Sequence, residues 1–435
     1  PLFGGIIAEK ILLAIIIVGT PIAGRLLMKK VGGSALPSYL LILLVHNKLL
    51  YFGFYNFSLG ILFMLLTLYA GLKTINKINA KQLLLLGLLY LLLYFSHLFF
   101  LFVTFGLHII VILNGQSGNF LDRIKNSSKS LQNLLLVAMP SFLITPFFLT
   151  SNTSNFNHQA YGLSELYQRF IELDAFQLSF KVSEFELFDS YAQSIWAVVL
   201  IIPVVWVITS IIKRKKQKVN GWFLVSLFLL ILYFIVPNSK LYMTDRLLIL
   251  LLVLMSVWTS TLSVPKYVYL LIIPLVFFIQ RNMQFSAMAF HHKSQVYIEK
   301  VIELKNYIPE NSLVSTFNLS TDWLESGHSH NYLGINGGLI DIYNYEAVLT
   351  YFPLQYNGHP FLITQYLKED NESGKPLIVS DGKKLSKNID HIIVIKDKSK
   401  NQKHIEKTEF LLRRGYDLTH SNEIANLYQY NYSKK

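Results

Sequence analysis

Six polar residues that could hold a phosphate, a sugar or a proton interrupt a chain that is otherwise strongly apolar. They are His46, Tyr55, Asn56, His97, Asp245 and Arg246. A guanidinium binds phosphate through its planar fork, and a histidine between two apolar runs needs a hydrogen-bond partner or water. Polar groups at membrane depth are costly and usually face a cavity or a partner. We therefore interpret the six residues as a candidate substrate-binding site.

Three carboxylates are weak candidates for a general base, the group that takes a proton from an attacking hydroxyl. Glu9 lies early in the chain, and Glu172 and Asp174 form a Glu-x-Asp pair in LSELYQRFIELDAFQL. The spacing of Leu163, Leu166, Phe170 and Leu173 predicts an amphipathic helix near 163–180 that lies on the membrane. On a helix, residues two apart point about 200° away from each other, so the pair is not expected to converge.

Some of these polar residues also have a plain structural interpretation. Tyr51 and Tyr55 are typical of the aromatic belt at a membrane interface. Lys48 is expected to extend its ammonium group to the lipid head groups. Asp245 is a favoured residue at the N-cap of a helix, so its role as a cap or as a binding residue stays open. Gly53 is expected to allow a close turn.

The elements that carry these residues are expected to be membrane-spanning helices. Of the 435 residues, 52% are hydrophobic and 15% are charged, whereas a soluble domain carries about 25% charged residues. The fold class is therefore an α-helical polytopic membrane protein. Ten hydrophobic segments are predicted, near 5–24, 36–52, 54–72, 82–96, 98–113, 131–150, 190–212, 221–236, 246–262 and 266–280. The fourth and fifth could instead form one long helix.

Basic residues gather in alternate loops between these segments. One set of loops carries Arg25, Lys29, Lys30, Lys73, Lys77, Lys81, Arg123, Lys125, Lys129, the run KRKKQK and Lys266. The other set carries only Lys48, Arg169, Lys181, Lys240 and Arg246. The positive-inside rule makes the first set cytoplasmic. The loop 151–189 and the C-terminal region are then extracytoplasmic, as in a multi-pass protein of a bacterial inner or plasma membrane, and the net charge of +13 reflects topology, not nucleic-acid binding.

Residues 281–435 are more polar and predict a small extracytoplasmic α/β domain, after a transmembrane domain over 1–280. An amphipathic helix precedes a strand through 313–317, HIIVIKD predicts a second strand, and a helix ended by Gly415 precedes a final strand in IANLYQYN. Alternation of helices and strands favours this class. The stretch between, rich in Gly, His, Asn and Tyr, is expected to be loop.

Metal and hydrolase signatures are weak or missing in the sequence. His328 with His330 and the adjacent His291 and His292 lack a third ligand at helical spacing. No HExxH, GxSxG or Walker-type motif occurs, and there are no cysteines. No cofactor is implied, and a divalent metal stays open.

The chain resembles the GT-C class of membrane glycosyltransferases. The resemblance lies in YFGFYNFSLG at the start of a helix, YLLLYFSHLFF at a broken helix, VPNSKLYMTDRLLILLL at an outer loop, and a helical bundle followed by an α/β domain that begins at YIPENSLV. It implies transfer of a sugar from a polyprenyl-phosphate carrier to a glycan, lipid or protein acceptor on the outer face of the membrane. It also implies lipid-bilayer and envelope-assembly partners.

The class places its catalytic carboxylate in the first outer loop, after the first helix. No such helix and loop precede Pro1 here. Either the sequence is truncated and the main carboxylate lies upstream of Pro1, or the chain is a relative without that activity. Within the chain, Glu9, Glu172 and Asp174 are only weak candidates for the base.

Three other functions stay open. A polysaccharide polymerase or ligase would favour several arginines and a histidine in the large outer loop, which offers Arg169 and His158. A transporter of lipid-linked sugars would favour an internal repeat and charges at mid-membrane. A non-catalytic assembly subunit would need no acidic motif.

Overall fold

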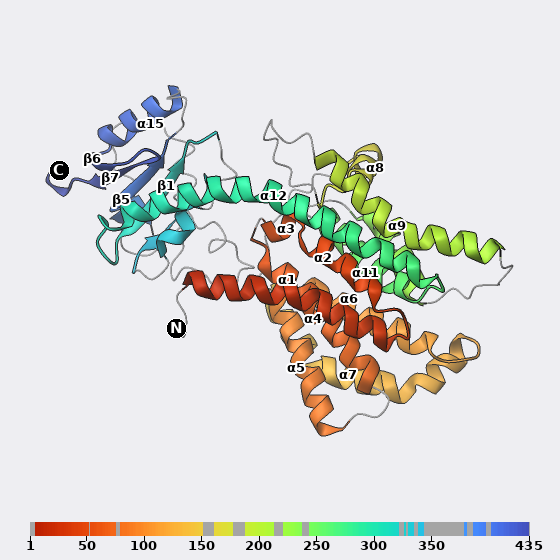
Figure 1. Cartoon of the computed structure of the whole chain (residues 1–435). Coiled ribbons are helices and arrows are strands. Elements are labelled where there is room, and N and C mark those ends of the chain that lie inside the picture. Colours follow the sequence, from red (N-terminus) through yellow and green to blue (C-terminus); the bar gives the residue numbers. More distant parts are fainter. Residues whose placement is uncertain are drawn as a thin grey trace. The chain divides into compact units, whose positions relative to one another are not determined.

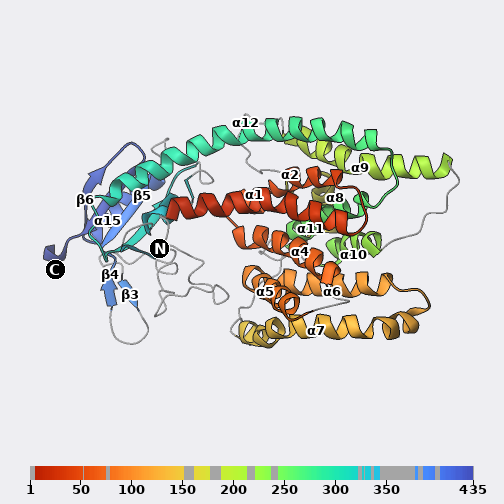
Figure 2. The same ribbon diagram turned by 60° about the horizontal axis from the view of Figure 1, so that its bottom comes forward.

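The computed structural model describes most of the chain, and its residues divide into two compact units (Figures 1 and 2). The described residues are 5–51, 53–74, 79–150, 161–176, 188–212, 221–236, 243–321, 326–327, 329–334, 338–342, 378–380, 386–396 and 402–434. One unit comprises residues 10–284, and the other comprises residues 1–9 with 285–435. The predicted boundary at 280 and 281 lies inside helix α12, close to this division.

The first unit is a bundle of helices. They are α1 (Gly5–Lys30), η1 (Leu36–Tyr39), α2 (Leu40–Val45), α3 (Lys48–Tyr51), α4 (Tyr55–Thr74), α5 (Ala80–Ser96), α6 (Leu98–Asn114), α7 (Phe120–Thr150), α8 (Leu163–Ile171), α9 (Phe188–Ile212), α10 (Gly221–Ile235), α11 (Met243–Ser260) and α12 (Lys266–Lys305).

Among the described residues, four of these helices are long and apolar enough to cross a membrane. These spans are Ile6–Lys30, Tyr55–Lys73, Ser194–Ile212 and Met243–Ser260, and α5, α6 and α10 are shorter apolar helices. A polytopic helical protein is therefore supported, whereas ten crossings stay a prediction. The apolar window of α11 is 89% buried, while those of α1 and α9 are 33% and 22% buried. Helix α11 is thus the centre of the bundle, as an all-round apolar helix in a protein interior should be.

The expected single segment over 36–52 is wrong in detail, because three short helical pieces replace it. Helix α2 ends at Val45, His46 leaves the helical conformation at its C-cap, and α3 begins at Lys48. Gly53 then has φ +80°, in the left-handed region that glycine tolerates, which confirms its predicted role in a close turn. The break leaves backbone hydrogen-bonding groups at the end of α2 and the start of α3 without partners in a continuous helix, in the middle of an apolar stretch.

Of two further helix boundaries, one confirms the prediction and one differs from it. His97 has an extended backbone (φ −167°, ψ 117°), so α5 and α6 are separate helices and the alternative of one long helix is excluded. In contrast, α12 runs without a break through 40 residues, from the predicted last hydrophobic segment into the predicted amphipathic helix. The hydrophobic segment and the amphipathic segment are therefore one helix, although sequence reasoning treats them as two.

The second unit is built on a five-stranded sheet of order β2-β1-β5-β7-β6. Its strands are β1 (Leu313–Asn318), β2 (Ile340–Asp341), β5 (His391–Ile395), β6 (Tyr416–Ser421) and β7 (Ala425–Tyr430). β2, β1 and β5 are parallel, and β7 and β6 are antiparallel to their neighbours. A separate antiparallel pair joins β3 (Ile378–Ser380) to β4 (Ser386–Asn388).

Helices cover both faces of this sheet. Val301 and Leu304 of α12 pack with Ile393 and Leu427, while Leu411 of α15 (Gln402–Arg413) packs in the cluster that contains Ile392. The C-terminal residues thus form the predicted small sheet with helices, and Gly415 ends the helix region with φ +81°. Strand β6 was not predicted, and short 3₁₀ turns lie at η2 (Ser329–Gly334) and η4 (Tyr432–Lys434).

Candidate functional site

Four charged side chains from three distant parts of the sequence meet inside the helical unit. Lys48 Nζ lies 3.2 Å from Asp174 Oδ2 and 3.9 Å from Asp245 Oδ2. Arg169 Nη2 binds Asp174 Oδ2 and lies 3.2 Å from Asp245 Oδ1. The four side chains are between 3% and 19% exposed. We call Lys48, Arg169, Asp174 and Asp245 the charge cluster.

Asn47 places Lys48 in the charge cluster. Its Nδ2 donates to the carbonyls of Leu44 and Val45, both at 3.1 Å, and its Oδ1 accepts from the Leu50 amide at 3.1 Å. One amide side chain therefore satisfies the carbonyl end of α2 and the amide end of α3. The Lys48 amide donates to the Ala175 carbonyl at 2.9 Å, which fixes Lys48 beside Asp174. The expectation that Lys48 extends to lipid head groups is wrong, since it is 7% exposed and ion-paired.

The end of α8 turns Asp174 back toward Arg169. The helix stops at Ile171, and Leu173 has φ +51°. The Asp174 amide donates to the Arg169 carbonyl at 3.0 Å and the Leu173 amide to the Phe170 carbonyl at 3.3 Å. These are the two hydrogen bonds of a Schellman motif, with an ion pair where an apolar contact usually sits.

This ending corrects the expectation of a helix over 163–180. The described helix covers only Leu163–Ile171, so Glu172 and Asp174 are not presented from helical turns. Asp174 joins the charge cluster, whereas Glu172 is exposed and accepts from Gln168 Nε2 at 2.8 Å. The two carboxylates do not converge, as expected, but the reason is the unwound helix end.

Asp245 lies in the first turn of α11 and is 2% exposed. The helix begins at Met243, so the interpretation of Asp245 as the N-cap is wrong. A carboxylate in the first turn is stabilised by the helix dipole. A buried charge also needs a close counter-charge, and here Arg169 and Lys48 supply it.

Arg169 connects the amphipathic helix to the bundle. Its guanidinium lies over the Tyr161 ring, with 4.5 Å between Cζ and the ring centre. Burial by itself lowers the pKa of Arg169, but the carboxylates of Asp174 and Asp245 outweigh it, so that pKa is raised above its ordinary value. Arg169 therefore stays charged whenever the cluster is formed.

A second polar group lies around Phe57, next to the charge cluster along α11. The Arg246 guanidinium lies 5.8 Å from the Phe54 ring centre and 5.7 Å from that of Phe57. The His97 ring meets Phe57 edge-on at 5.9 Å, and its Nδ1 accepts from the Phe99 amide at 3.3 Å. His97 is thus the N-cap of α6, and one aromatic ring joins the two predicted residues His97 and Arg246.

The other predicted binding residues make local contacts. His46 Nδ1 lies 3.3 Å from the Tyr51 hydroxyl, and Tyr55 packs on the small cluster around Ile16. Asn56 is exposed, and its Oδ1 accepts from the Phe57 amide at 2.9 Å. These contacts account for His46, Tyr55 and Asn56 through the local structure of the turn. Of this polar stretch, Lys48 is the residue that joins the charge cluster.

Glu9 belongs to the other unit. Its Oε2 accepts from the Tyr332 hydroxyl at 3.3 Å. Burial, together with the Glu9 carboxylate, raises the pKa of Tyr332 to about 12. Glu9 is therefore engaged by Tyr332, and it is not a member of the charge cluster.

An apolar groove of about 490 Å³ opens beside the end of α8. It is lined by Phe170, Ile171, Trp196, Leu200, Phe223, Ser226, Leu227, Leu230, Leu251, Met255 and Trp258. Trp196 Nε1 donates to the Ile171 carbonyl at 3.0 Å, which fixes this wall to α8. Phe170 and Ile171 directly follow Arg169, so the groove starts one residue from the charge cluster. A groove of this kind can hold a hydrocarbon chain.

The part of the chain that the structure describes has no group of three or more His, Cys, Asp or Glu side chains that could hold a metal ion. His330 Nδ1 instead lies 2.6 Å from Asp341 Oδ2 in the second unit. His291 and His292 are exposed on α12, and His328 and His158 lie outside the described residues.

Sequence reasoning missed two members of the charge cluster, Lys48 and Arg169. The available signal was their position in the set of loops with few basic residues, where Arg169 also has Glu172 and Asp174 close by in the sequence. No family model, curated protein or solved structure matches this chain. The resemblance to the GT-C class therefore stays a prediction from the sequence patterns.

Proposed function

We propose that this protein transfers a sugar from a polyprenyl-phosphate carrier to an acceptor at the outer face of the membrane. The observation that carries the proposal is the position of the charge cluster beside the apolar groove. A polyprenyl-phosphate sugar has a hydrocarbon chain, an anionic phosphate and a polar sugar. The groove suits the chain, and Lys48, Arg169 and Arg246 suit the phosphate.

The chemistry requires one proton acceptor and one stabilised leaving group. The acceptor hydroxyl attacks the anomeric carbon, and a new carbon–oxygen bond forms. The bond from the anomeric carbon to the phosphate oxygen breaks, and its electron pair leaves with the polyprenyl phosphate. A carboxylate takes the hydroxyl proton, while the cations stabilise the phosphate.

Asp174 is the residue that we assign to proton removal. Its side chain is 16% exposed, compared with 3% for Asp245, so it is the more accessible carboxylate. In the structure it is held by Lys48 and Arg169. A donor phosphate competes for the same two cations, so donor binding releases Asp174 for the acceptor. Asp245, deeper in the bundle, keeps Arg169 oriented.

A non-catalytic assembly subunit is the second candidate function. The favouring observation is that two cations and two carboxylates of the charge cluster neutralise one another. Such a balanced cluster holds α8 on the bundle without any substrate. In that case the groove would bind a membrane lipid or a helix of a partner.

The test uses the purified full chain in proteoliposomes with a panel of radiolabelled polyprenyl-phosphate sugars and a membrane extract as acceptor source. Asp174→Asn should lower transfer at least about 100-fold, the usual effect of losing a general base. It should keep donor binding, measured as quenching of Trp196 and Trp258 by a brominated isoprenyl phosphate. Glu165→Gln, an exposed carboxylate on the same helix, is the matched control and should change neither readout.

The groove is tested in the same assay. Leu227→Trp fills the groove and should weaken donor binding, whereas Leu224→Trp, on the same helix but not lining the groove, should not. Full transfer by Asp174→Asn would remove it as the base. Quenching without transfer for every donor would favour the assembly subunit, and equal effects of the two tryptophans would remove the groove from the site.

A further inference from the structure

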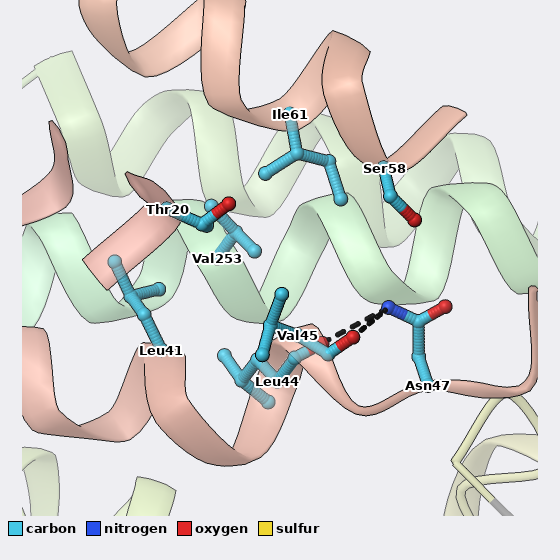
Figure 3. Close-up of a pocket in the computed structure, with 8 residues that line it drawn as sticks. All are labelled: Thr20, Leu41, Leu44, Val45, Asn47, Ser58, Ile61 and Val253. Carbon is cyan, nitrogen blue, oxygen red and sulfur yellow. Dashed lines mark hydrogen bonds between the residues drawn. The ribbon is translucent and has the colours of Figure 1, made fainter. Parts of the chain in front are cut away.

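A small cavity lies in the bundle among α1, α2, α4 and α11 (Figure 3). It is lined by Thr20, Leu41, Leu44, Val45, Asn47, Ser58, Ile61 and Val253. The space open to the centre of a water-sized sphere is about 10 Å³, which is about what one water molecule needs. All the lining residues belong to the helical unit, and none is a member of the charge cluster.

Two hydroxyl groups that line the cavity have no hydrogen-bond partner among the residues that the structure describes. They are Thr20 Oγ1 and Ser58 Oγ, and both residues are 2% exposed. Several other buried hydroxyls of this bundle bind a carbonyl of their own helix. Ser226 donates to Trp222 at 3.0 Å and Ser256 to Leu252 at 2.9 Å. A buried hydroxyl left without a partner costs free energy, and Thr20 and Ser58 are two such hydroxyls that line the same cavity.

Asn47 offers a third polar group. Its Nδ2 is used by the Leu44 and Val45 carbonyls, and its Oδ1 accepts from the Leu50 amide. A side-chain carbonyl oxygen has two lone pairs, so Oδ1 can accept one more hydrogen bond. Figure 3 shows the Ser58 hydroxyl directed toward the Asn47 amide.

We propose that this cavity holds one ordered water molecule that bridges Thr20, Ser58 and Asn47. The water accepts from one hydroxyl and donates to the other and to Asn47 Oδ1, which gives the two to four polar partners that a buried water needs. It thereby becomes part of the junction between α2 and α3 that places Lys48. The inference is independent of the proposed transferase activity, because it concerns the packing of the bundle alone.

The sign of a change in thermal stability tests the proposal. Thr20→Val keeps the shape of the side chain and removes the hydroxyl. If a water bridges the three residues, Thr20→Val removes one of its hydrogen bonds and should lower Tm by about 2–4 °C. Ser58→Ala should lower Tm for the same reason. In a dry cavity, Thr20→Val removes an unpaired buried hydroxyl and should raise Tm.

Thr104→Val is the matched control. Thr104 Oγ1 is also buried without a hydrogen-bond partner in the described part of the chain, but Thr104 does not line the cavity. This variant should leave Tm unchanged or raise it, while Thr20→Val lowers it. Equal changes for Thr20→Val and Thr104→Val would overturn the proposal.

Two further measurements fix the occupant. A high-resolution map of the full chain in a lipid nanodisc should show one density peak within hydrogen-bond distance of Thr20, Ser58 and Asn47, and an empty cavity would overturn the proposal. Replacing sodium and potassium by choline should leave Tm of the wild type unchanged. If choline lowers Tm of the wild type but not that of Thr20→Val or Ser58→Ala, the occupant is a bound cation instead of water.

Discussion

At the scale of residues, each charged side chain of the charge cluster depends on the others for its stability in the bundle interior. Lys48, Arg169, Asp174 and Asp245 are each costly to bury alone, and each is tolerable because two opposite charges lie near it. Removing one member therefore leaves an uncompensated charge in a medium of low dielectric constant. The cost of such a change exceeds the net contribution of the intact cluster to stability.

Arg169→Met should accordingly lower the free energy of unfolding by about 3–5 kcal/mol, the range for breaking a buried ion pair. The variant keeps the aliphatic volume but leaves Asp174 and Asp245 with Lys48 alone. Thermal unfolding of the detergent-solubilised full chain measures the effect. Arg169→Met combined with Asp174→Asn should regain part of the loss, because the charge balance is restored.

Arg413 provides the matched control. It pairs with Glu409 at 3.0 Å on α15, but the two side chains are 63% and 57% exposed. An exposed pair four residues apart on a helix is worth about 0.3–0.5 kcal/mol, so Arg413→Met should hardly change Tm. Similar losses for both arginines would contradict the view that burial gives the cluster its importance.

The residue types of this site were predictable, but their pairing was not. His97, Asp245 and Arg246 stand out as polar residues in apolar surroundings, and in the structure Asp245 is buried and ion-paired with Lys48 and Arg169. Lys48 and Asp174 lie 126 residues apart, and no local rule relates them. Lys48 was predicted to lie at the membrane interface because its partner, Asp174, is far away in the sequence and close only in the folded bundle.

At the scale of elements, the end of α8 decides which carboxylate joins the site. Leu173 adopts a left-handed conformation with φ +51° although it is not glycine, and its side chain is fully buried. A left-handed residue with a Cβ costs about 1–2 kcal/mol. Burial of the leucine offsets this strain and keeps Asp174 turned toward Arg169.

The order of stability of two variants tests this account. Leu173→Ala loses the buried side chain and keeps the strain, whereas Leu173→Gly loses the side chain and relieves the strain. The glycine variant should be more stable than the alanine variant by about 1 kcal/mol. In the interior of the same helix, Leu166→Ala should be more stable than Leu166→Gly by about 1 kcal/mol. Chemical denaturation of all four variants gives the comparison. If alanine is more stable than glycine at both positions, the strain argument is wrong.

Elements with a long uniform pattern were predicted best. The helices α4, α9, α10 and α11 lie within a few residues of the expected segments, and β1, β5 and β7 lie where the sequence indicates strands. The misses share a cause. In 36–52 the apolar pattern continues through a break that Asn47 stabilises, and in α12 the pattern changes character without a break. Hydrophobicity marks the environment of a segment, and it does not mark where the hydrogen bonds of a helix stop.

At the scale of the whole molecule, the distribution of basic residues carries the topology. Arg123, Lys125 and Lys129 lie near the start of α7, and the run KRKKQK follows α9. The positive-inside rule predicts that these loops are cytoplasmic. It predicts that α8, with Arg169, and the C-terminal unit are extracytoplasmic. The proposed function needs this orientation, because a donor used at the outer face must meet the charge cluster there.

The chain has no cysteines, so single serine-to-cysteine variants report the topology without background. Ser128 near the start of α7, Ser164 in α8 and Ser433 near the C-terminus are all exposed. A membrane-impermeant maleimide added to intact cells should label Ser164→Cys and Ser433→Cys, and it should label Ser128→Cys only after permeabilisation. Labelling of Ser128→Cys in intact cells would reverse the orientation. Labelling of only one of the other two would show an odd number of crossings between α8 and the C-terminal unit, against the even number that the predicted segments require.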